Sequence, residues 1–198
     1  MYEEENFKEA AKYLCSCFLE NAQFGKNSEN LKTMLKINIA ILLLHDDKEL
    51  MENRFFNPLK HDSASTFKME PDVQGLFGLI EAFNCLNLKS FQEILQVVDF
   101  SVTKGTGFSE IESKILLELK KQKTLFIIKA YKTIKFDYIK RRINENDDTI
   151  INILFSLIAE DKIHGIINVG ERYFQTSPPK QRYYEMQIEN LRDLQERM

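Results

Sequence analysis

The side chains that could hold a metal ion or begin nucleophilic catalysis are few and scattered. They are three histidines and three cysteines: His45, His61, His164, Cys15, Cys17 and Cys85. Zinc sites on helices use close pairs such as H-x-H or H-E-x-x-H, and a cysteine nucleophile needs a histidine base and a group that orients it. The sequence contains no such histidine pair, and nothing in it ties a cysteine to a histidine. We therefore predict no catalytic residue, no metal ligand and no cofactor.

The sequence also contains no motif for phosphate binding or for general acid–base catalysis. Gly75 and Gly78 lie within a helical pattern, where small residues permit close packing and do not form a phosphate loop. The many carboxylates fall on the outer faces of expected helices, where they are solvated. These observations favour a protein that is not an enzyme.

The amino-acid composition excludes further classes of protein. The chain has 198 residues, of which 43% are apolar and 29% charged, and it contains only 7 Gly and 4 Pro. These values exclude disorder and leave enough apolar material for a core. The net charge of −3 disfavours non-specific binding to nucleic acid. The three cysteines favour a reducing compartment, and the longest apolar run, 37–44, is too short to cross a bilayer.

Apolar spacing predicts a mainly α fold, and the first part, residues 1–108, is a helical-repeat segment of the tetratricopeptide kind. Helices over 6–23 and from Ser28 form an antiparallel hairpin, and 52–70 is a polar loop. Pro71 suits the first turn of a helix that ends near Asn84, and a shorter helix follows over 89–98.

The second part, residues 109–176, has the element order of a winged helix. Ser109 and Glu112 have capping-box spacing at the start of a helix that runs to about Lys132, with Tyr131 on its inner face. A short strand at Ile134 and Phe136 follows. Two short helices and a two-stranded hairpin complete the order, over 138–143, 147–161 and 163–175.

The last part, residues 177–198, is a hinge and a helix. Pro178-Pro179 precedes a stripe of four apolar residues with a charged opposite face: Tyr184, Ile188, Leu191 and Leu194. An amphipathic helix behind such a hinge suits packing on another subunit. From the pattern alone, folding back onto this chain is almost as well supported.

A winged helix also raises the question of DNA binding. Lys140-Arg141-Arg142 is a basic cluster, but the helix that would enter a groove begins with Asp147-Asp148. Acidic residues there repel a phosphate backbone, so nucleic-acid binding is only a remote alternative.

Two segments resemble the PCI family, which is named for the proteasome lid, the COP-nine signalosome and initiation factor three. Residues 125–134 (LFIIKAYKTI) resemble the family's "LIKLIKPYTRI", which leads into its winged helix. Residues 157–168 (LIAEDKIHGIIN) resemble "ILDNTIHGRID" at the start of its wing. Residues 67–73 (FKMEPDV) are similar to "YKNDPEI" in the subunit-two branch of the signalosome. Pro178-Pro179 is instead shared with the paralogous branch of the proteasome lid.

The resemblance implies a non-catalytic scaffold in the cytoplasm and nucleus. The expected partners are other PCI subunits and isopeptidase subunits with an MPN domain, in a signalosome that removes Nedd8 from cullin–RING ubiquitin ligases. A lid scaffold is the alternative. These relatives are about twice this length, and the N-terminal arm that grips the cullin is not matched, so we expect only an indirect link to the ligase.

The partner surface is expected at two places. Tyr173 and Phe174 are adjacent aromatics in what we expect to be the outer strand of the wing, so one of them faces a partner or both are accommodated by the domain itself. The second place is the apolar stripe of the last helix.

Overall fold

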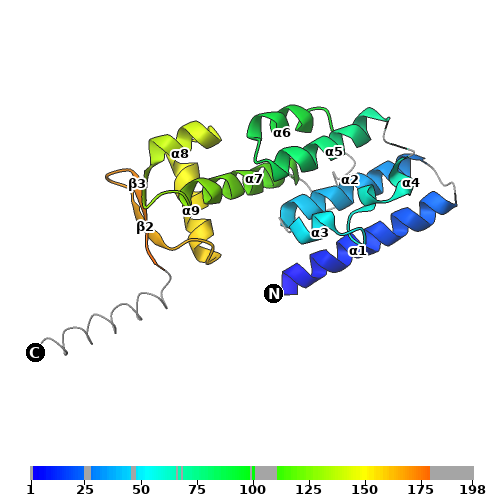
Figure 1. Cartoon of the computed structure of the whole chain (residues 1–198), viewed down its shortest axis with the longest axis horizontal. Coiled ribbons are helices and arrows are strands. Elements are labelled where there is room, and N and C mark those ends of the chain that lie inside the picture. The colour runs from blue at the N-terminus through cyan, green and yellow to red at the C-terminus, as the bar shows by residue number, and fades with distance from the viewer. Residues whose placement is uncertain are drawn as a thin grey trace, which may run out of the picture. The chain divides into compact units, whose positions relative to one another are not determined.

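The computed structural model describes residues 2–24, 28–45, 48–65, 67, 69–98, 100 and 111–178. The fold is mainly helical with one small antiparallel sheet, as predicted (Figure 1). The chain divides into two compact units, residues 1–119 and residues 120–198. The division falls within helix α7 (Ile111–Ile128). We describe each unit by itself.

The first unit begins with the predicted helical hairpin. Helices α1 (Tyr2–Gln23) and α2 (Ser28–His45) lie side by side and bury a shared apolar face that includes Phe18, Leu35 and Ile39 (Figure 1). Asn38 is buried in this interface and donates a side-chain hydrogen bond to the carbonyl oxygen of Ala11 at 2.8 Å. The bond fixes the register of α2 on α1.

Residues 52–70 are more structured than the predicted loop, so that prediction is partly wrong. The segment follows α3 (Lys48–Glu52) and contains the single 3₁₀ turn η1 (Pro58–Lys60) and α4 (Asp62–Ser65). Asn57 orders it, because its side chain donates to the Met51 carbonyl at 2.7 Å and accepts from the Leu59 N–H at 3.0 Å.

A second helical pair follows, as predicted. Pro71 is the first residue of α5 (Pro71–Asn84), and α6 (Leu88–Leu95) begins after Asn87, whose side chain caps it by accepting from the Ser90 N–H. The two helices contact each other, and the rings of Phe83 and Phe91 lie 6.1 Å apart.

Helix α7 ends earlier than predicted, and its predicted start cannot be compared. Ser109 lies outside the described residues, and the helix ends at Ile128, not at Lys132. The chain turns over 129–131, so Tyr131 is 43% exposed and its predicted inner position is wrong.

The second unit has the predicted element order. After α7 come β1 (Thr133–Lys135), α8 (Phe136–Ile143), α9 (Asp147–Ala159), β2 (Gly165–Asn168) and β3 (Tyr173–Thr176). Asn146 caps α9 by accepting from the Thr149 N–H at 2.8 Å. The core of the unit is formed by large apolar side chains of the two helices and the sheet: Phe136, Ile139, Ile143, Ile150, Leu154, Leu157 and Phe174.

The sheet order is β1-β3-β2, with both pairings antiparallel. Strand β3 is therefore central, and the prediction that Tyr173 and Phe174 lie on the outer strand is wrong. Ile134 faces Phe174 across one pairing, and Ile167 faces it across the other. Strand β1 pairs with the edge of β3 that would be free if the sheet contained only the β2–β3 hairpin.

Candidate functional site

The residues that could bind a metal or act as nucleophiles lie in separate environments. His45 contacts the ring of Phe7, His61 lies 2.6 Å from the Arg54 carbonyl, and His164 lies 3.5 Å from Asp161. Cys15 is buried, and burial raises the pKa of its thiol to about 11. Within the described ranges, no group of three His, Cys, Asp or Glu side chains could hold a metal ion.

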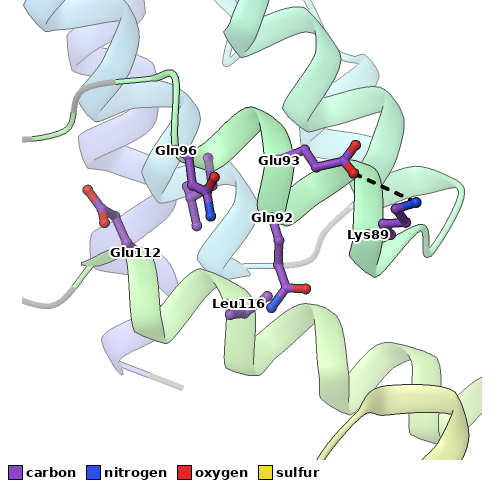
Figure 2. A pocket seen from close by; sticks show the side chains of 7 residues that line it. Lys89, Gln92, Glu93, Gln96, Glu112 and Leu116 are labelled. Carbon is purple, nitrogen blue, oxygen red and sulfur yellow. Dashed lines mark ion pairs between the residues drawn. The ribbon is translucent and has the colours of Figure 1, made fainter.

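The first unit contains an open hollow of about 470 Å³ beside α6 and the start of α7 (Figure 2). Five of its seven lining residues are polar or charged: Lys89, Gln92, Glu93, Leu95, Gln96, Glu112 and Leu116. Lys89 and Glu93 form a loose ion pair at 3.9 Å across one turn of α6. The lining contains no cysteine, serine or histidine, and its amide and charged side chains can donate and accept hydrogen bonds.

The free edge of β2 is the part of the sheet best suited to contact another protein. The Ser177 N–H donates to the His164 carbonyl at 2.9 Å, which marks that pair as hydrogen-bonded. Because hydrogen-bonded and open pairs alternate in antiparallel sheets, the backbone groups of Gly165 and Ile167 point away from β3. They are available for one more strand.

The side chains on the two edges differ. Ile166 pairs with Gln175 on the outer face of the sheet and is 66% exposed, and Val169 in the following turn is also exposed. Strand β1, at the other edge, is only three residues long and carries the exposed Lys135. Short strands with lysine resist pairing, whereas an apolar edge favours it. Sequence reasoning missed Ile166, although its place in the wing and its apolar neighbour, Ile167, were available signals.

The predicted site residues are distributed as follows. Phe174 is fully buried in the core, and Tyr173 is half-buried on the central strand. The four residues of the C-terminal stripe, Tyr184, Ile188, Leu191 and Leu194, lie outside the described residues. The structure therefore brings Tyr173 and Phe174 into the sheet and leaves the interface prediction for the last helix untested.

Carboxylates lie beside one member of the basic cluster on α8, Lys140, and beside Arg172. Lys140 lies 3.9 Å from Asp147, and Arg172 bridges Asp137 at 2.9 Å and Asp147 at 2.7 Å. Asp148, beside Asp147, is exposed at the start of α9. A nucleic-acid backbone that followed α9 would meet these acids.

Two further findings, on membrane-spanning helices and on protein families, are negative. Within the described ranges, no helix combines the length and apolar character needed to span a bilayer. No protein-family model matches the chain.

Curated relatives are found in several organisms, and each is named COP9 signalosome complex subunit 2. The protein of Schizosaccharomyces pombe is 19% identical over 192 residues, which cover 97% of this chain and 42% of the relative. That of Dictyostelium discoideum is 23% identical over 165 residues, covering 83% and 35%, and that of Caenorhabditis elegans is 20% identical over 112 residues, covering 57% and 23%. The chain spans less than half of the length of these relatives. It resembles COP9 signalosome complex subunit 2, as its sequence motifs indicated.

Proposed function

We propose that this chain is a non-catalytic scaffold subunit of the COP9 signalosome. It would hold other subunits in place while the complex removes Nedd8 from cullin–RING ligases, in the cytoplasm and nucleus. The single observation that carries this proposal is the resemblance to signalosome subunit 2 along almost the whole chain in the fission yeast relative. The finer parts of the proposal rest on the motifs and the geometry that follow.

The second unit supports a winged helix of the PCI type. Its order of helix, strand, two helices and hairpin is the order expected of a winged helix, which supports the proposal. Residues 125–134 cover the end of α7 and the start of β1, and His164-Gly165 lies at the start of β2.

The β2 edge is the surface we propose for a neighbouring PCI subunit. A strand added there would find the outward N–H and C=O groups of Gly165 and Ile167, and the exposed side chain of Ile166 beside it. Main-chain bonds supply affinity in this mode, and the alternate side chains supply specificity.

Expression of tagged full-length chains in the source cells, followed by gentle purification and mass spectrometry, tests the proposal. The wild-type chain is expected to recover other PCI subunits, an isopeptidase subunit and cullins. The Ile166→Lys variant is expected to lose its PCI neighbour, because it adds a charge at the free edge. Gln175→Lys is the matched control: it adds the same charge on the same face but on the central strand, and is expected to retain the complex.

Three outcomes oppose the proposal in different ways. Recovery of proteasomal ATPases would move the chain to the proteasome lid, and recovery of nucleic acid alone would favour the remote alternative. Retention of every subunit by Ile166→Lys would overturn the β2 edge as the interface while leaving the complex assignment intact.

The apolar stripe of residues 184–194 is proposed as a second contact, with the helices of the isopeptidase subunits. Leu191→Asp is expected to release the chain from them, since each large apolar side chain contributes roughly 1.5–3 kcal/mol when it is fully buried. Asn190→Asp adds the same charge one position away from the stripe and serves as the control. Continued assembly of the Leu191→Asp chain would contradict this contact.

A further inference from the structure

Charge is distributed unequally along this chain. Residues 120–178 contain 11 Lys and Arg against 7 Asp and Glu, whereas residues 1–119 contain 12 against 19. The second unit is therefore cationic within an acidic protein. Most of the cations nearest its core are nevertheless matched: Lys120 pairs with Glu145, Lys121 lies 2.7 Å from Glu160, and Arg172 bridges two aspartates.

Lys123 and Arg142 are the exception. Lys123 is half-buried on α7 and Arg142 is exposed near the end of α8. Burial lowers the pKa of Lys123, and the positive charge of Arg142 lowers it further. Among the described residues, neither forms an ion pair with a carboxylate. An anion that bound to both cations would supply the counter-charge that they lack among the described residues.

Two tyrosines fix the arginine in this position. The Arg142 guanidinium lies 5.3 Å from the centre of the Tyr138 ring, and its Nη2 donates to the Tyr138 hydroxyl at 3.2 Å. The Tyr131 hydroxyl donates to the same oxygen at 3.1 Å, and the two rings meet edge to face at 5.5 Å. We call Lys123, Tyr131, Tyr138 and Arg142 the tyrosine–arginine cluster. Its stacked arginine is preorganised, which reduces the entropy lost when an anion binds.

We propose that the tyrosine–arginine cluster is a docking site for an acidic peptide segment of a partner protein. A carboxylate would accept charge-assisted hydrogen bonds from Lys123 and Arg142, while the exposed part of Tyr131 contacts the neighbouring side chain. A local carboxylate ligand fits better than an extended phosphate backbone, because exposed aspartates in the first turns of α8 and α9, Asp137 and Asp148, would repel a backbone that ran along these helices.

Titration of the ¹⁵N-labelled full chain with an oligo-glutamate peptide at low ionic strength tests this site. Amide shifts are expected around Lys123, Tyr138 and Arg142, and an oligo-glutamine peptide of equal length is expected to produce none. The double variant Lys123→Gln/Arg142→Gln is expected to weaken binding by roughly tenfold or more, because two charge-assisted hydrogen bonds are lost. The matched control is Lys12→Gln/Lys114→Gln, which removes the same charge from exposed positions of the first unit and is expected to bind almost normally.

The proposal is overturned if oligo-glutamate leaves the cluster unshifted, or if the control variant loses as much affinity as the cluster variant, since only net charge would then matter. A single-stranded oligonucleotide of equal charge provides the third arm. Tighter binding of the oligonucleotide, lost on the same double substitution, would also overturn it and assign the cluster to nucleic acid. None of these outcomes depends on membership of the signalosome.

Discussion

Gly165 lies directly against the ring of Phe174. A Cβ atom at position 165 would come within 2.4 Å of Phe174 Cζ and 2.3 Å of the Gln175 carbonyl oxygen. The carbonyl belongs to the backbone of the central strand and cannot turn aside. The glycine at the start of β2 therefore allows this strand to pack closely against β3 and the buried ring of Phe174, independently of any partner protein.

Gly165→Ala is expected to loosen the β2–β3 hairpin by about 1–3 kcal/mol, the usual penalty for adding a group to a filled site. Amide hydrogen exchange of peptides from 163–177 measures this local stability. Gly170→Ala is the control, because a Cβ there would meet nothing closer than Asn168 Oδ1 at 3.7 Å. Equal exchange in the two variants would show that the tight contact carries no energy.

Asn57→Ala is expected to destabilise the first unit by about 1–3 kcal/mol, because the buried Met51 carbonyl and Leu59 N–H both lose their side-chain partner. Urea unfolding followed by circular dichroism tests this. Within the described part of the chain, the side chain of the half-buried Asn53 bonds only to the nearby Phe55 N–H, so Asn53→Ala is expected to cost about 0.5 kcal/mol. If both variants unfold at the wild-type urea concentration, Asn57 does not hold the segment together.

Asn57 also shows why part of the first unit could not be predicted from the sequence. The long helices could be predicted from apolar spacing and from Pro71, because these signals are local and repeat over several turns. Helices of three to five residues have no period to detect. Residues 52–65 are ordered by the buried Asn57 amide and by contacts of η1 and α4 with α1, which polarity alone does not indicate.

The strand order of the sheet could also be predicted only in part, because one of its pairings joins residues that are far apart in the sequence. The hairpin could be predicted from its apolar strands and the turn between them, but the pairing of Ile134 with Phe174 joins residues 40 positions apart. That pairing makes β3 central and transfers the free edge to β2. The candidate contact consequently moves from Tyr173 and Phe174 to Ile166, on the other strand of the same hairpin.

Cys15 and Cys85, two of the three cysteines, are expected to differ greatly in their reactivity towards alkylating agents. Cys15 is buried and burial raises its pKa to about 11, so at pH 8 only about one thiol in a thousand is ionised, whereas Cys85 is exposed. Alkylation by iodoacetamide at pH 8, followed by peptide mass spectrometry, is expected to label Cys85 first and Cys15 only after urea is added. Equal labelling rates in the folded chain would contradict the burial of Cys15.

Glu160 gives the second unit a specific sensitivity to acid. Its partial burial favours the neutral form, but hydrogen bonds from Lys121, Ser156 and Lys162 outweigh that effect and lower the pKa of the carboxyl from 4.5 to about 2. Because the pKa is lower in the folded state, the ionised carboxylate stabilises the fold above about pH 4.5. That stabilisation is lost as the pH falls from about 4.5 towards 2.

Glu160→Gln is therefore expected to lower the free energy of unfolding at pH 7 by about 1 kcal/mol, a value reduced for solvent screening because the side chain is 34% exposed. The difference from the wild type should shrink below pH 4.5 and vanish below pH 2, where the wild-type carboxyl is protonated too. Urea unfolding over this pH range measures both quantities. Glu81→Gln, an exposed position on α5, is expected to change neither, and a Glu160→Gln deficit that persists undiminished at pH 2 would show that the loss is steric and not electrostatic.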